Sequence, residues 1–169
     1  MTAYIALLRA VNVGGTGKLP MTELKAMCEA QGFAKVRTYI ASGNVVFDAP
    51  GDEAAVKAAL ERTLAAYAGK PVGVCVRTGP EMAAVLAANP FPEAAPNRTA
   101  AIFIDAPPPA DALEHAKGVA DEKMALGLRE IYVHFGNGMA DSRLRIPAAA
   151  AGTMRNMNTV AKLAAMALE

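Results

Sequence analysis

Tryptophan is absent from this sequence, and aromatic residues make up only 5% of it. Sheets that bind single-stranded nucleic acid stack the bases on aromatic side chains, often within an RNP-type motif that is not found here. The composition therefore disfavours nucleic-acid binding, which we keep as an alternative function.

Histidine and cysteine are also scarce, with two of each in the chain. His115 and His134 have no neighbouring ligands at the spacing of a metal site. Cys28 and Cys75 form no Cys-x-x-Cys pair and are typical of small buried residues in a reducing compartment. We therefore expect no metal ion, no cofactor and no disulfide.

Long apolar runs and an excess of charge are missing as well. No run approaches the roughly 18 apolar residues that cross a bilayer, and residues 2–9 lack the basic leader of a secretory signal. The net charge is +1, so no overall field would draw the protein to nucleic acid or to a membrane. We predict a cytoplasmic, globular protein of bacterial type.

Four segments of the first half have the patterns of β-strands. Residues 3–9 are almost uniformly apolar and residues 45–47 are a short continuous apolar run, which is typical of central strands. In residues 35–40 and 72–77 the residues that would face the two sides of a sheet differ in kind and alternate along the chain, as in edge strands.

Two helices are expected between these strands. Pro20 begins the first helix and Gly32 ends it, whereas Asp52 caps the second and Gly69 closes it. The order is βαββαβ, the ferredoxin-like arrangement, in which the first and third strands are central. We therefore predict an α+β fold whose residues 1–78 form a ferredoxin-like subdomain.

The pattern of predicted strands and helices changes after this unit. Residues 79–169 are predicted to form a second, smaller α+β subdomain. The expected elements are a helix at 79–89, a strand at 99–104, a short helix before Gly118, a hairpin of 121–126 and 129–135, and a last helix from about Asn158. The alanine-rich residues 148–151 fit either a helix or a loop.

A candidate binding site follows from the topology. The first and second strands of a βαββαβ sheet run parallel, so the glycine-rich loop 12–18 and the turn 42–44 should meet at one edge. Glycines let main-chain N–H groups converge on an anion, and the loop leads to a helix N-terminus. The alternative is that the glycines only permit turns. The candidate ligand-binding residues here are Asn12, Gly14, Gly15, Ser42 and Asn44.

The same loop does not form a nucleotide-binding P-loop. That motif needs glycine at its first position and a hydroxyl after the lysine. Asn12 and Leu19 occupy these two positions, so we exclude an NTPase of this class.

A second polar cluster lies near the end of the chain, where residues 142–168 contain no acid. Arg155 could hold a carboxylate or phosphate beside the N-terminus of the last helix, with Asn158 near it. Arg37, Arg143 and Lys162 would add charge. The alternative is a structural clamp, in which asparagines cap the helix and Arg155 pairs with an acid of the first subdomain. We expect Arg155 and the loop of Asn12 to line one hollow.

Several motifs resemble a bacterial family known as domain of unknown function 1697. They are residues 4–15 (YIALLRAVNVGG), 19–21 (LPM), 32–33 (GF), 37–47 (RTYIASGNVVF) and 153–163 (TMRNMNTVAKL). The resemblance implies two linked α+β subdomains, the first ferredoxin-like, and implies no particular activity. The chain departs from the family pattern at Met157, where an aromatic residue is usual, and in an alanine-rich stretch at 146–152.

These observations favour a binding or accessory protein whose polar surface recognises an anionic small molecule or a phosphate-bearing ligand. No nucleophile–base set is evident, because Ser42 does not lie in Gly-x-Ser-x-Gly and neither histidine has a fixed partner. The catalytic residues are therefore unassigned. The alternatives are single-stranded nucleic-acid binding, an enzyme acting on an anionic small molecule, and a purely structural or oligomerising protein.

Overall fold

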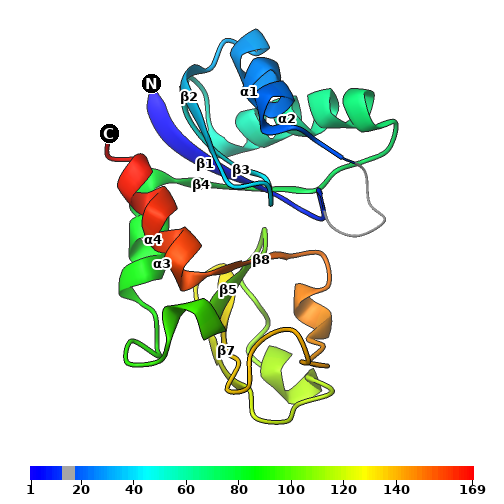
Figure 1. The fold of residues 1–169 in the computed structure, drawn as a ribbon, viewed down its shortest axis with the longest axis vertical. Coiled ribbons are helices and arrows are strands. Elements are labelled where there is room, and N and C mark those ends of the chain that lie inside the picture. The colour runs from blue at the N-terminus through cyan, green and yellow to red at the C-terminus, as the bar shows by residue number, and fades with distance from the viewer. Residues whose placement is uncertain (13–17) are drawn as a thin grey trace. The chain divides into compact units, whose positions relative to one another are not determined.

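The computed structural model describes residues 1–12 and 18–169 (Figure 1). They form two compact units, one of Met1–Met82 together with Leu163–Glu169 and the other of Ala83–Lys162. The sequence had suggested a division after residue 78, with the whole C-terminal helix in the second part. In the structure the last seven residues, Leu163–Glu169, group with the first unit.

The first unit has the predicted βαββαβ order. Its elements are β1 (Thr2–Leu8), α1 (Met21–Ala30), β2 (Ala34–Tyr39), β3 (Asn44–Ala49), α2 (Glu53–Ala68) and β4 (Val74–Thr78). The strands lie in the order β2-β3-β1-β4, and each is antiparallel to its neighbours. This is the ferredoxin-like arrangement, with β1 and β3 central as the apolar runs predicted.

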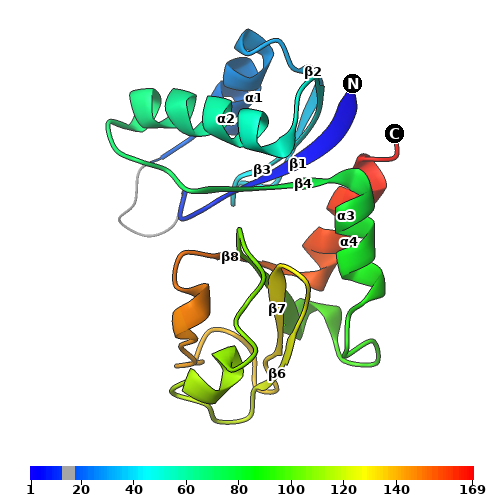
Figure 2. The ribbon, with the colours of Figure 1, turned by 180° about the vertical axis from the view of Figure 1, so that it is seen from behind.

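Both helices of this unit lie on one side of the sheet (Figures 1 and 2). The main core between sheet and helices includes Leu8, Phe47, Leu24 and Leu60, all fully buried. Asp52 caps α2 as predicted, since its Oδ1 accepts a hydrogen bond of 2.9 Å from Ala55 N. Two glycines with left-handed φ angles follow the helices, Gly32 at +86° and Gly69 at +72°.

The second unit contains an antiparallel sheet in the order β6-β7-β5-β8. Its strands are β5 (Thr99–Phe103), β6 (Lys123–Leu126), β7 (Glu130–His134) and β8 (Thr153–Asn156). The hairpin of β6 and β7 was predicted. Strand β8 was not, because the sequence around it had been interpreted only as a polar cluster before a helix.

The remaining helices are α3 (Gly79–Ala87) and α4 (Met157–Met166), with 3-10 turns η1 (Pro96–Arg98), η2 (Ala112–His115) and η3 (Pro147–Ala149). The predicted capping box begins α3, because Thr78 N donates to Glu81 Oε1 at 2.8 Å and Glu81 N donates to Thr78 Oγ1 at 3.2 Å. The short helix expected before Gly118 is the 3-10 turn η2. Among the described residues, no helix has the length and apolar character to cross a membrane.

Candidate functional site

The loop after β1 and the turn after β2 lie together at one end of the first sheet. Asn44, the first residue of β3, pairs with Leu7 of β1 on one side and with Tyr39 of β2 on the other. Leu8 N donates to Gly43 O at 2.8 Å, and Asn12 Nδ2 donates to Ala41 O at 2.8 Å. The structure therefore brings Asn12, Ser42 and Asn44 to one place, as the topology predicted.

The polar side chains at this end bind the protein's own main chain. Asn12 bonds twice to Leu19, through Nδ2 to its carbonyl at 2.8 Å and through Oδ1 to its N–H at 2.7 Å. Asn44 is fully buried, and its Nδ2 donates to Tyr39 O at 2.9 Å and to Ser42 Oγ at 3.0 Å. These bonds hold Asn12 against Leu19 and fix the turn around Ser42. Gly14 and Gly15 lie outside the described residues.

Left-handed backbone conformations gather at the same end. Ala10, Asn12 and Ile40 have φ angles of 55°, 56° and 51°, which are unfavourable for residues with a Cβ and especially for a β-branched one. Gly43 has φ of +91°, and a Cβ there would lie 2.7 Å from Val11 Cγ2. Strain of this kind persists only where the surrounding structure holds it, and it clusters at functional sites.

A small pocket of about 200 Å³ opens beside this strained end, and we refer to it as the sheet-end pocket. Its wall includes Val11, Lys18 and Leu19 from the loop after β1, Leu64 and Tyr67 from α2, and Lys70. The two bonds between Asn12 and Leu19 close the base of the loop, so both of its ends contribute to this wall.

The charged residues that line the sheet-end pocket, Lys18 and Lys70, are both basic. The sequence contains no acid from Arg9 to Leu19 or from Arg62 to Pro80. Arg9 lies close by, since its N–H donates to Gly73 O at 2.9 Å. The side chains of Lys18 and Lys70 are exposed and make no ion pair within the described part of the chain. Sequence reasoning did not name these two lysines as ligands, although the acid-free stretches were a usable signal.

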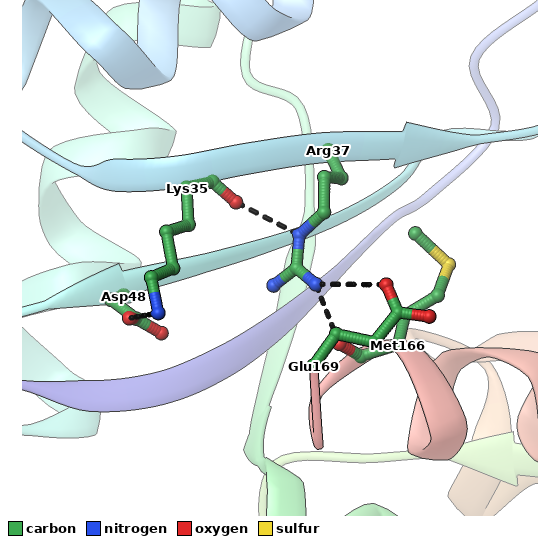
Figure 3. Close-up of polar contacts among 5 residues, drawn as sticks. All are labelled: Lys35, Arg37, Asp48, Met166 and Glu169. Carbon is green, nitrogen blue, oxygen red and sulfur yellow. Dashed lines mark hydrogen bonds and ion pairs between the residues drawn. The ribbon is translucent and has the colours of Figure 1, made fainter.

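Arg37 acts as a structural clamp in the first unit (Figure 3). Its Nη1 donates to Met166 O at 2.6 Å and lies 3.5 Å from Glu169 Oε2, while Nε donates to Lys35 O at 2.9 Å. Nη2 is buried and has no hydrogen-bond partner among the described residues. Met166 O also accepts a hydrogen bond of 3.2 Å from Glu169 N. The guanidinium adds a charge-assisted bond at the electron-rich end of α4 and so stabilises its last turn.

The other predicted site residues belong to the second unit. Arg155 is 8% exposed on β8, and its Nη1 donates to Thr153 Oγ1 at 2.8 Å and to Met154 O at 3.0 Å. Asn156 caps α4, because its Oδ1 accepts a hydrogen bond of 2.9 Å from Thr159 N. Asn158 and Lys162 are exposed one turn apart on α4, and Arg143 is exposed in the loop before β8. The hollow expected between Arg155 and the Asn12 loop stays a prediction.

The structure offers little nucleophilic or metal chemistry in the described residues. No three His, Cys, Asp or Glu side chains in that part of the chain gather closely enough to hold a metal ion. Cys28 and Cys75 are both buried and are not joined in a disulfide. Burial, helped by the neighbouring Glu29 carboxylate, raises the pKa of Cys28 to about 12, so this thiol stays protonated and unreactive.

Comparisons with known proteins agree with this architecture. The conserved bacterial protein SP0830 from Streptococcus pneumoniae has a similar fold, with a TM-score of 0.79, 24% sequence identity and 98% of each chain covered. A comparison with curated proteins finds no match. The model of a family described as a protein of unknown function, DUF1697, matches residues 1–132, and the chain therefore belongs to that family.

Proposed function

We propose that this is a cytoplasmic binding or accessory protein of bacterial type that recognises a small anion in the sheet-end pocket. One observation carries the proposal: Lys18 and Lys70 line the same pocket, and neither is neutralised by an acid among the described residues. An anion between them would be attracted by both ammonium groups. Cys28 and Cys75 are buried and not joined in a disulfide, which suits the reducing compartment that we propose.

The size and lining of the pocket limit the ligand. Its volume of about 200 Å³ is below the usual range of roughly 300–1,000 Å³ for drug-sized ligands. A phosphate group or a small carboxylate is therefore the class that we expect. Apolar neighbours such as Val11 and Leu64 reduce the local dielectric constant, which strengthens the attraction between the lysines and an anion.

The site residues predicted from sequence support this proposal indirectly. Asn12 bonds to Leu19 and so holds together the two segments that line the pocket, and Asn44 with Ser42 fixes the adjacent turn. Their side chains position the main chain and Lys18; they are not themselves the charged ligands. No residue of the wall is an evident general base, so we propose binding and not catalysis.

Nucleic-acid binding receives less support from the geometry. In the first sheet, the face opposite the helices carries Ile5, Leu7 and Val46, which are aliphatic and fully buried. Tyr39 is the one aromatic residue that the strand register adds to this face. A single ring is a poor platform for stacking successive bases.

Thermal unfolding of the full chain tests the proposal. Inorganic phosphate and acetate would be compared with chloride at equal ionic strength, for the wild type and for Lys18→Gln/Lys70→Gln. Lys25→Gln is the matched control, because Lys25 is an exposed lysine of the same unit outside the pocket. We expect phosphate or acetate to raise the Tm of the wild type and of the control, and the double variant to lose most of this increase.

The comparison between variants is essential for two reasons. Phosphate stabilises folded proteins generally because it is excluded from their surface, and Lys70 follows the C-cap of α2, where a cation interacts favourably with the helix dipole. The relevant quantity is therefore the anion-dependent change in Tm. An equal increase in all three proteins, or none in the wild type, would refute the proposal.

A further inference from the structure

The sheet of the second unit has two different faces. Ala101 pairs with Tyr132 on β7 and with Arg155 on β8, so these three side chains share one face. Tyr132 Oη donates to Val85 O of α3 at 2.8 Å, so this face of the sheet lies toward α3. Ile102, with its partners Ile131 and Met154, lies on the opposite face.

That opposite face forms the floor of a pocket of about 620 Å³ in the second unit, and we call it the apolar pocket. Its wall is completed by the loops around η2 and η3. The apolar residues that matter most are Ile102, Phe135, Met139, Leu144, Ile146 and Met154. A pocket of this volume and lining is in the range that holds small organic ligands.

Two cations line the apolar pocket, and the main chain holds them together. Lys117 N donates to Arg145 O and Arg145 N donates to Lys117 O, both at 2.8 Å. Residues paired in this way project their side chains to the same side of the two chains. Two like charges directly opposite each other repel, so an anion that interacts with both relieves an unfavourable contact.

The pairing of these two residues cannot shift easily. Gly118, next to Lys117, has φ of +70° and lies against Arg143, where an added Cβ would overlap the carbonyl oxygen. Only glycine allows the two segments to approach so closely at that φ angle. The backbone therefore fixes the two residues that carry the cations opposite each other at the pocket.

The described residues of the pocket wall include no acid that could neutralise them. The side chains of Lys117 and Arg145 make no ion pair or hydrogen bond with any residue that the structure describes. The nearby carboxylate of Glu122 is occupied, because it accepts hydrogen bonds from Ser142 Oγ and Ala120 N, which lower its pKa. The hydroxyl proton of Ser142 is thereby directed to Glu122 and not into the pocket.

We propose that the apolar pocket binds an aliphatic carboxylate, whose chain lies on the surface formed by Ile102, Phe135 and Met154 and whose head group is held by Lys117 and Arg145. Arginine matches a carboxylate with two parallel hydrogen bonds, and the apolar floor removes the chain from water. This site is in the second unit and shares no residue with the sheet-end pocket. A negative result for one of the two proposals therefore leaves the other unaffected.

Calorimetric titration of the full chain with decanoate tests the site, with decanol and decyltrimethylammonium as ligands of the same chain and different charge. We expect decanoate to bind at least about tenfold more tightly than either, because only the carboxylate gains charge-assisted hydrogen bonds. Equal binding of the three ligands would mean that the pocket is only an apolar surface. Absence of decanoate binding to the folded wild type would exclude the site.

Variants locate the binding. Lys117→Gln/Arg145→Gln should weaken decanoate binding by about tenfold or more and leave decanol binding unchanged. Lys123→Gln is the matched control, because Lys123 is an exposed lysine of the same unit outside the pocket. Met154→Ala, at an exposed pocket position, should weaken both decanoate and decanol. Decanoate affinity that is equal in the cation variant and in the control would overturn the proposal.

Discussion

Asn12 and Leu19 are joined by two hydrogen bonds, in which the side-chain amide of Asn12 pairs with the main-chain N–H and carbonyl of Leu19 as a neighbouring strand would. A third bond links the same amide to Ala41 O at 2.8 Å. One side chain therefore joins the end of β1, the start of the segment leading to α1 and the turn after β2. The geometry of the sheet-end pocket depends on it.

Asn12→Ala should destabilise the protein, because all three bonds are lost and alanine disfavours the φ of 56°. We expect a decrease of about 2–3 kcal/mol in the free energy of unfolding, measured by urea denaturation. Asn12→Gly separates the two causes, since it removes the bonds and tolerates the left-handed backbone. An alanine variant as stable as the wild type would show that the clamp contributes nothing.

Gly43 should not accept a side chain. Its φ is +91°, and an added Cβ would lie 2.7 Å from Val11 Cγ2 and 2.9 Å from Leu8 Cβ. Gly43→Ala is expected to lower the free energy of unfolding by about 2–4 kcal/mol, from backbone strain together with overpacking. Gly32→Ala is a matched control, because φ is +86° there and nothing lies within 4 Å. If both substitutions lower the free energy of unfolding by the same amount, the close approach at Gly43 does not contribute to the loss of stability.

The first sheet was predictable because its hydrophobic pattern matches its burial. Residues 3–8 and 45–47 are apolar and lie on the two central strands, whereas Arg9 is exposed just beyond β1. Strand β8 has the opposite pattern: Thr153 and Arg155 are buried, whereas Met154 is 39% exposed. A strand whose polar residues are buried and whose apolar residue is exposed does not follow the alternation on which sequence interpretation relies.

The candidate sites were predicted only in part, for a related reason. The meeting of the loops at Asn12 and Asn44 follows from topology, and the sequence was sufficient to predict it. Lys117 and Arg145 are far apart in sequence and meet through one isolated bridge outside the named strands. No periodic pattern marks such a pairing, so only the folded structure identifies the two cations as neighbours.

Arg37 should stabilise the end of α4 more than its exposed ion pair alone would allow. Its bond of 2.6 Å to Met166 O is partly buried, whereas the side chain of Glu169 is 67% exposed. We expect Arg37→Met to lower the free energy of unfolding by about 1–3 kcal/mol and Glu169→Gln by less than about 1 kcal/mol.

Hydrogen exchange gives the local measurement for this contact. In Arg37→Met the amides of Ala167 and Leu168, which bond to Leu163 O and Ala165 O, should exchange faster than in the wild type. Amides in the middle of α2 serve as an internal reference. Unchanged exchange at the end of α4 would mean that the guanidinium does not stabilise this turn.

Cys28 should make the stability of the protein fall at alkaline pH. Burial raises the pKa of its thiol from the ordinary value of 9.0 to about 12. Between these values the unfolded chain releases the proton and the folded chain keeps it, so unfolding becomes more favourable as pH rises. The free energy of unfolding should decrease by about 1.4 kcal/mol for each pH unit well above 9 from this group alone.

Cys28→Ala isolates this contribution, because the other titrating groups remain in both proteins. The variant should be less stable near neutral pH, since it leaves a small cavity at a fully buried position. Urea denaturation from pH 8 to pH 10.5 should then show the stability of the wild type falling more steeply, so that the difference between the two proteins narrows as pH rises. Parallel pH profiles would mean that the thiol ionises in the folded protein as readily as in the unfolded chain.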